Sequence, residues 1–396
     1  MSMDQLDQFD FSSVAEKLGK KYEQLLNKLE HVNIVIAGKT GVGKSTLVNA
    51  VFNLQGGERA KTGIGSHMTE RSEWYTVPDK PLRLYDTVGL ELGTEQQETV
   101  KADILEQIRL NADTVDKAVH VIWYCISTTS SRIEKSEIEW ISSLARCAVQ
   151  YSSGYGNVKV IIVLTQSYID FQDDAAKMHE IVKDNLPEVS DCIPVVAERR
   201  GANPQSGIEE LVYATNRVLP DAVCQAFINA QMASMDLKIK AARKLVRNYA
   251  ISAAGTGAAP IPFSDAPLLI TAEISMMAHI AVTFGIDFEE KMLATLATTM
   301  LGVTAATATG KTIVSNILKM IPGAGTAVGA VISGSTALLI TKALGEVFIQ
   351  IMTMLCSGSI TTKDMESDSF KEKIRQMLKR ELKKSSKVED AADGLA

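Results

Sequence analysis

Short apolar runs alternate with segments of helical periodicity along the first half of the chain. The runs typical of strands cover residues 32–37, 72–77, 82–86, 118–125 and 158–164, and a last strand ends near residues 194–199. Between them, residues 46–52, 95–110 and 133–148 place apolar side chains three or four positions apart, which is typical of amphipathic helices. Strands that alternate with helices predict a doubly wound sheet of the α/β class over residues 32–220.

The pattern changes in the second half of the chain. Residues 251–356 contain only ten charged residues, and 22 residues without a charge separate Lys319 from Lys342. A stretch of that length can cross a bilayer, and its small residues Gly325, Gly329 and Ser333 repeat every four positions, a spacing that lets helices approach closely. We therefore expect an all-α, apolar helical domain over residues 221–362 that is associated with a membrane.

A soluble helical bundle is the alternative interpretation of the same half. Pro322, the abundance of Ala, Gly, Ser and Thr, and the presence of Glu273 and His279 in an apolar segment all favour it. Membrane contact without spanning is the intermediate possibility.

Amphipathic segments flank these two regions. Residues 11–30 place Phe11, Leu18 and Leu25 at helical spacing, so residues 1–31 are expected to form an N-terminal amphipathic helix. Residues 363–396 are expected to form a basic amphipathic helix and a disordered tail. Such a helix is most often solvated on its polar face, and an anionic membrane surface is the sharper alternative.

Composition narrows the class of partner and the compartment. A formal net charge of -6 and a pI near 5.6 argue against a general nucleic-acid binder, which is usually basic. The five cysteines are scattered and form no metal-like pairing with histidine, as in a reducing cytosol. The acidic, polar first residues predict no signal peptide.

A glycine-rich loop follows the first strand and precedes a helix. It is Gly38-Lys39-Thr40-Gly41-Val42-Gly43-Lys44-Ser45, with Thr46 next. This is the phosphate-binding loop pattern in the strand–loop–helix context that it requires. Its glycines let backbone N–H groups surround a polyphosphate, Lys44 is placed to bind the β- and γ-phosphates, and the Ser45 hydroxyl is placed to bind Mg²⁺.

Two later segments carry residues that sense a γ-phosphate. Thr69 lies in a polar loop before the second strand, where a threonine can bind both Mg²⁺ and the γ-phosphate, and Thr62 is the second candidate. Asp86 ends the third strand and is a candidate Mg²⁺ ligand, and the Gly89 N–H follows it. In this order the motifs resemble those of Ras-like and Era-like GTPases, which implies GTP/GDP and Mg²⁺ as ligands and Lys44, Thr69 and Gly89 as catalytic groups.

Leu90 departs from the Ras-type pattern. That position carries a water-orienting glutamine in Ras-type GTPases, and a leucine cannot orient water. The resemblance therefore implies a GTPase with slow intrinsic hydrolysis that needs another source of water positioning.

The base-binding motif is altered as well. Thr165-Gln166-Ser167-Tyr168 stands where the family has Asn/Thr-Lys-x-Asp, so Gln166 replaces the lysine and Tyr168 replaces the guanine-binding aspartate. Asp170 is the alternative carboxylate. Ala197 and Glu198 resemble the second base-contacting loop of the family.

Further resemblances concern subclass and partners. The phosphate loop resembles those of septins, plastid import-receptor GTPases and immunity-related GTPases, some of which form homodimers across their nucleotide faces. The second half resembles a helical domain of unknown function that follows Era-like GTPase domains in bacterial proteins. Together these imply a cytoplasmic GTPase at the inner face of the cell membrane whose nucleotide state switches the helical domain. A ribosome-assembly GTPase and a nucleotide-stabilised scaffold with little turnover are the alternatives.

Overall fold

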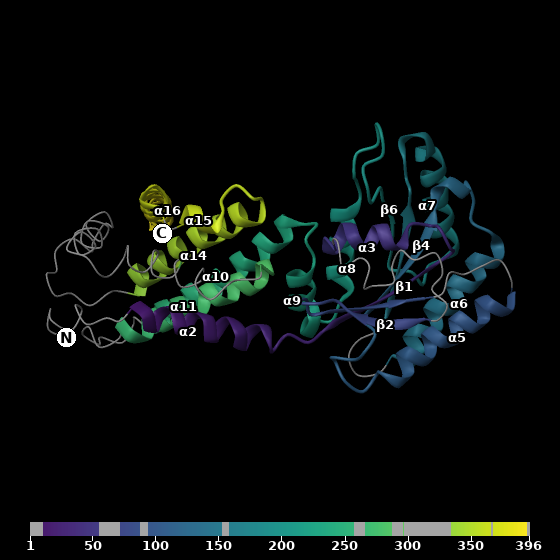
Figure 1. Ribbon diagram of the computed structural model, residues 1–396, viewed down its shortest axis with the longest axis horizontal. Helices are drawn as coiled ribbons and strands as arrows, with labels where there is room; N and C mark the ends of the chain where they lie inside the picture. Colours follow the sequence, from purple (N-terminus) through teal and green to yellow (C-terminus); the bar gives the residue numbers. More distant parts are fainter. Residues whose placement is uncertain are drawn as a thin grey trace, which may run out of the picture. The chain divides into compact units, whose positions relative to one another are not determined.

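The computed structural model describes residues 11–54, 72–87, 94–152, 158–256, 266–286, 296, 334–365 and 367–393. The chain divides into two compact units. One unit runs from Leu29 to Leu237, and the other combines the residues up to Lys28 with those from Lys238 onward. The first unit is an α/β domain and the second is helical (Figure 1).

A six-stranded mixed sheet forms the centre of the first unit, in the order β2-β3-β1-β4-β5-β6. The strands are β1 (Val32–Gly38), β2 (Glu73–Thr76), β3 (Leu82–Asp86), β4 (Val121–Ser127), β5 (Lys159–Thr165) and β6 (Asp191–Pro194). All pair in parallel except β2, which is antiparallel to β3 at the edge. The expected α/β class is confirmed, and because β3 and β4 flank β1, the strand order reverses beside the carboxyl end of β1.

Helices cover both faces of this sheet. On one face, α5 (Thr94–Leu110), α6 (Lys135–Tyr151) and α7 (Gln172–Asn185) share a single hydrophobic core with the strands. On the other face, α3 (Lys44–Phe52), α8 (Ile208–Val218) and α9 (Asp221–Ala230) pack against the central strands. Side chains alternate across a strand, so Tyr124 of β4 enters the first core while its neighbour Trp123 faces α3 and α8.

Three aromatic rings join α3 to the sheet and to α9. The Phe52 ring is stacked on Trp123 at a centroid distance of 6.0 Å and meets Phe227 edge-on at 6.3 Å. The Trp123 indole Nε1–H donates to the Thr215 hydroxyl at 3.0 Å, so the buried ring has a polar partner. This cluster fixes the helix that follows the glycine-rich loop.

The helical unit is built from both ends of the chain. It contains α2 (Phe11–Leu26), α10 (Met235–Thr256), α11 (Ala266–Phe284), α14 (Gly334–Cys356), α15 (Thr362–Met365) and α16 (Asp368–Asp393). Helix α2 packs along α11, and the Tyr22 hydroxyl donates to the Ile286 carbonyl at 2.9 Å. Helix α14 packs against both α11 and α16.

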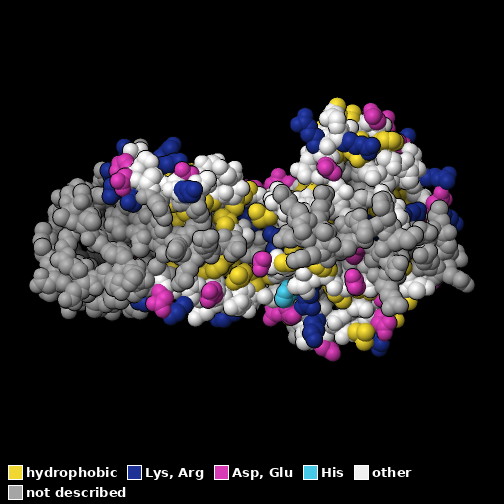
Figure 2. Space-filling view, in the orientation of Figure 1, with side chains coloured by type: hydrophobic (Ala, Val, Ile, Leu, Met, Phe, Trp, Pro, Cys, Tyr) yellow, Lys and Arg dark blue, Asp and Glu magenta, His cyan; other side chains and the backbone are white. Residues whose placement is uncertain are grey.

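Helices α10 and α14 approach closely at one glycine. A Cβ at Gly345 would lie 2.5 Å from a methyl carbon of Val246, so a larger residue would push the two helices apart. The Arg243–Glu346 ion pair, at 3.0 Å, closes the exposed side of the same contact. On the face drawn in Figure 2, Lys and Arg side chains are intermixed with Asp and Glu over α15 and α16.

One helix among the described residues is long and apolar enough to cross a membrane. It is Ala337–Cys356, with a mean hydropathy of 1.6, and 56% of its apolar window is buried inside the protein. A buried core helix of a soluble protein has the same features. The predicted spanning stretch, residues 320–341, lies largely outside the described residues.

Truncating Phe52 should destabilise the α/β unit. We expect Phe52→Ala to lower its free energy of unfolding by about 3–5 kcal/mol, because the fully buried ring leaves a cavity between Trp123 and Phe227. Guanidinium unfolding followed by tryptophan fluorescence measures the change. Leu110→Ala is the control, because Leu110 is 58% exposed and its truncation should change stability by less than about 0.5 kcal/mol. Equal losses in the two variants would contradict the assignment of Phe52 to the core.

Candidate functional site

The loop between β1 and α3 turns through backbone conformations that only glycine adopts easily. Gly38, Gly41 and Gly43 have φ angles of 139°, 78° and 92°. A Cβ on Gly38 would lie 2.4 Å from the Cys125 carbonyl oxygen of β4, so the loop leaves the sheet without room for a side chain. Helix α3 begins directly after Gly43, and its first N–H groups therefore face the loop.

Lys44 lies at the start of that helix with its ammonium folded into the loop. The Nζ donates to the Gly38 carbonyl at 2.8 Å and to the Lys39 carbonyl at 3.1 Å. Burial lowers the pKa of the Lys44 ammonium from its ordinary value, and the nearby Cys125 and Asp86 groups oppose part of that shift. The cation is thus held among carbonyl oxygens and beside an acidic side chain.

Asp86 reaches the same loop from the end of β3. In the parallel pairing of β1 with β3, Asp86 stands opposite Ile36, two residues before the loop begins. The next residue fixes this end of the strand, because the Thr87 hydroxyl donates to the Ile36 carbonyl at 3.0 Å. The carboxylate is therefore delivered to the edge of the sheet where α3 starts.

The loop after β5 is tied to the glycine-rich loop. The Thr165 hydroxyl is within hydrogen-bond distance of the Val42 carbonyl, at 2.5 Å, and of the Ile126 carbonyl, at 3.2 Å. Gln166 has a φ of 56°, a left-handed conformation that is uncommon outside glycine. Its amide Nε2 is 3.4 Å from the Gly41 carbonyl, at the long end of hydrogen bonding.

The connection between β4 and α6 supports Gln166 from the other side. The Ser127 hydroxyl donates to the Gln166 side-chain oxygen at 2.7 Å, and the Thr128 hydroxyl donates to the Gln166 backbone carbonyl at 2.7 Å. These bonds hold a strained residue in place. Sequence reasoning did not identify Ser127 or Thr128, because their role depends on strand pairing rather than on a local motif.

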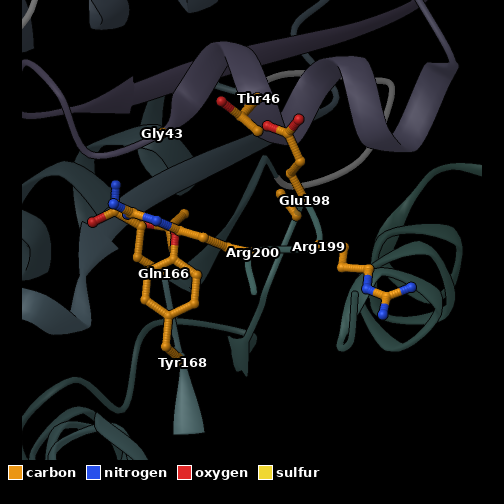
Figure 3. A pocket seen from close by; sticks show the side chains of 9 residues that line it. Gly43, Thr46, Gln166, Tyr168, Glu198, Arg199 and Arg200 are labelled. Carbon is orange, nitrogen blue, oxygen red and sulfur yellow. The ribbon is translucent and has the colours of Figure 1, made fainter. Parts of the chain in front are cut away.

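A cavity of about 400 Å³ opens between these loops (Figure 3). It is lined by Gly43 and Thr46 from the loop and α3, by Thr165, Gln166 and Tyr168 after β5, and by Ala197, Glu198, Arg199 and Arg200 after β6. The Arg200 guanidinium lies over the Tyr168 ring at 5.6 Å, a cation–π contact. In Figure 3 Glu198 extends toward α3, whereas Arg199 points to the opposite side.

The structure brings most of the candidate residues together. Seven of the nine lining residues were expected from sequence, and Arg199 and Arg200 are additions that no motif had marked. Asp170, the alternative base-binding carboxylate, is exposed in a short 3-10 turn (Ile169–Phe171) and does not line the cavity. Thr62, Thr69, Gly89 and Leu90 lie outside the described residues.

Such an arrangement binds an anion at one end and a flat ring at the other. Backbone N–H groups, a helix N-terminus and an ammonium suit phosphates. A tyrosine ring and two adjacent loops at the far side suit an aromatic base. Across the residues that the structure describes, no group of three or more His, Cys, Asp or Glu forms a metal cluster, so a metal here would need ligands from the phosphates or from water as well.

Comparison with known proteins supports this interpretation of the first unit. Residues 33–166 match the family described as 50S ribosome-binding GTPase, and residues 222–385 match a domain of unknown function, DUF697. A tRNA modification GTPase, MnmE, from Actinobacillus pleuropneumoniae serotype 3 is 28% identical over 154 residues, which are 38% of this chain and 30% of that protein.

Two further relatives match shorter segments. Magnetosome membrane protein 22 of Magnetospirillum gryphiswaldense is 25% identical over 113 residues, 28% of this chain and 56% of that protein. The small ribosomal subunit biogenesis GTPase RsgA of Clostridium perfringens is 39% identical over 77 residues, 18% of this chain and 26% of that protein. The chain thus spans about half or less of the length of the curated relatives that it matches.

A solved structure of a probable GTP-binding protein, engB, covers 47% of this chain and 98% of its own, at 18% identity and a TM-score of 0.33, too low to support an argument. The two family matches lie in different parts of the chain and do not overlap. The chain therefore belongs to the P-loop GTPases through residues 33–166 and carries a DUF697 domain over residues 222–385.

Proposed function

We propose that the protein binds GTP and GDP together with Mg²⁺ and hydrolyses GTP to GDP slowly. One observation carries the proposal: the glycine-rich loop, with Lys44 folded into it and Asp86 beside it, opens directly into the cavity between the β5 and β6 loops. Phosphates in the loop and a base in the cavity would occupy both parts with one ligand.

The residues around Lys44 suit Mg²⁺ as well as phosphate. Ser45 supplies a hydroxyl in the first turn of α3, and Asp86 supplies a carboxylate, the oxygen donors that Mg²⁺ prefers. These two residues would hold the ion together with phosphate oxygens, and Thr69 is the third proposed ligand. When bound, the ion would neutralise charge that develops on the phosphates.

Hydrolysis is proposed to be slow in the isolated protein. Lys44 would stabilise charge on the transferred phosphate, and Thr69 and the Gly89 N–H would respond to the γ-phosphate. Leu90 offers no group to orient water, so faster turnover would require a second copy paired across the nucleotide faces or a separate activating protein.

The cavity also bears on base preference. Ala197 lines it, and its N–H is the proposed partner of the guanine oxygen. Tyr168, flanked by Arg200, stands where related GTPases have an aspartate, and it offers a ring face rather than a carboxylate. We therefore propose that the base is held mainly by stacking and by the backbone.

The nucleotide state is proposed to switch the helical domain at a membrane surface. Support comes from the apolar helix Ala337–Cys356 and from a relative whose name includes "membrane protein". The basic residues of α16 are suited to anionic lipid headgroups. In this proposal the protein acts at the inner face of the cell membrane, and residues 1–31, 32–220, 221–362 and 363–396 act as separate functional segments.

A ribosome-assembly GTPase is the second candidate. The name of the RsgA relative and the description of the matching family favour it. A net charge of -6 opposes it, because RNA binding usually requires a basic surface. A nucleotide-stabilised scaffold with little turnover is the third candidate.

Removing the Lys44 ammonium should abolish nucleotide binding. We expect Lys44→Ala to weaken binding of a fluorescent GDP analogue by at least about a hundredfold, because the charged hydrogen bonds to the phosphates are lost. Fluorescence titration of the full chain measures the affinity. Lys135→Ala is the control, since that side chain is 91% exposed on α6. Retained micromolar affinity in Lys44→Ala would mean that the loop does not bind phosphates.

The cavity should distinguish GDP from IDP poorly. IDP lacks the 2-amino group that a carboxylate in the aspartate position would bind, so we expect the two nucleotides to bind within about threefold of each other, and ADP more weakly. Competition against the fluorescent GDP analogue gives the three affinities. A preference for GDP above about tenfold would require a carboxylate at the base, and Glu198→Gln and Asp170→Asn would then identify which one.

Membrane association should depend on nucleotide. We expect the full chain to co-sediment with liposomes that contain anionic lipid, and the bound fraction to differ between GDP, a non-hydrolysable GTP analogue and no nucleotide. Neutral liposomes are the control for the electrostatic part. Equal recovery in the supernatant under all conditions would remove the membrane proposal while leaving nucleotide binding intact.

A further inference from the structure

A buried carboxylate outside the phosphate-binding motif contacts the phosphate loop. Glu137 lies in the first turn of α6 and is only 3% exposed. Its Oε2 accepts a hydrogen bond from the Lys39 ammonium at 2.6 Å, and its Oε1 accepts one from the Tyr124 hydroxyl at 3.0 Å. Both carboxylate oxygens are therefore paired, one with the loop and one with the sheet.

Lys39 connects this carboxylate to the ammonium of Lys44. The Lys39 side chain leaves the loop toward α6, and the backbone carbonyl of the same residue accepts a hydrogen bond from the Lys44 Nζ at 3.1 Å. The side chain of Lys39 is 29% exposed, so the ion pair is shielded from solvent on the Glu137 side and open at its edge. A shift of Lys39 would move a carbonyl that positions Lys44.

The energetics make this pair more than a surface contact. A carboxylate out of water is unfavourable unless it is paired, and removal of one partner leaves an uncompensated charge. Burial and the Glu137 carboxylate raise the pKa of the Tyr124 phenol well above its ordinary value, so Tyr124 remains a proton donor to Glu137. Tyr124 belongs to β4, and the carboxylate is thereby held on the sheet while it holds the loop.

We propose that Glu137 is a positioning residue for the phosphate loop, which through Lys39 keeps the loop in the shape that receives a nucleotide diphosphate. The inference rests on the proposed nucleotide binding and adds to it a residue from α6, 93 positions after Lys44 in the sequence. A loop shaped before binding loses less conformational freedom when the ligand arrives. Loss of the clamp should therefore shorten the lifetime of bound GDP.

Dissociation of a fluorescent GDP analogue from the full chain tests the proposal. We expect Glu137→Gln and Lys39→Met each to raise the dissociation rate about tenfold. The double variant should dissociate no faster than Lys39→Met alone, because both changes break one interaction. Lys39→Arg keeps the charge and should restore the rate to within about threefold of wild type.

Asp116→Asn is the matched control. It breaks an ion pair of the same length, Arg83 Nη2 to Asp116 Oδ2 at 2.6 Å, at the opposite end of β3 from the loop. We expect it to lower the melting temperature and to leave the dissociation rate unchanged. If Glu137→Gln does not fold, Lys39→Met and Tyr124→Phe supply the same comparison from the two partners of the carboxylate.

The outcomes separate this inference from the proposed function. A wild-type chain that does not bind the GDP analogue overturns the proposed function itself. Normal wild-type binding with a dissociation rate in Glu137→Gln or Lys39→Met within about twofold of wild type overturns the clamp alone. So do effects of Lys39→Met and Glu137→Gln that multiply, or an increase in Asp116→Asn equal to that in Glu137→Gln.

Discussion

The candidate site depends on a backbone that must turn sharply as soon as it leaves a fully buried strand. Every residue of β1 is buried, and the next residues take left-handed conformations at Gly41 and Gly43 before α3 starts. The Cys125 carbonyl lies so close to Gly38 that any side chain there would displace β4. This steric constraint, rather than any side-chain contact, fixes where the first N–H groups of α3 point.

The connection from β4 to α6 supports this backbone at two places. Ser127 and Thr128 hold Gln166 in the loop after β5, and Glu137 holds Lys39 in the loop after β1. One short stretch of chain thus contacts both walls of the cavity. Such networks are stabilising only when every member is paired, and among the described residues that form this one each named polar group has a partner.

The sequence predicted those parts of the structure that local patterns determine. The β1–loop–α3 segment and the parallel strands were evident because glycine placement and buried apolar runs act over a few residues. The antiparallel β2 was not, since nothing in Glu73–Thr76 specifies the direction of its partner. Arg200 and Glu137 reach the site through long-range packing that no motif encodes, and Tyr168 showed a departure from the family without showing what stands beside it.

The helical unit takes α2 from one end of the chain and its remaining helices from the other, with the whole α/β unit between them. The α/β unit is therefore an insertion that is covalently joined to the same helical body at both of its ends. Cutting the chain before Lys238 to isolate the DUF697 region would discard α2 and expose the side of α11 against which Leu18 and Tyr22 are buried. A fragment chosen from the family boundaries alone would lack one of its own core helices, and aggregation of that fragment would say nothing about affinity for lipid.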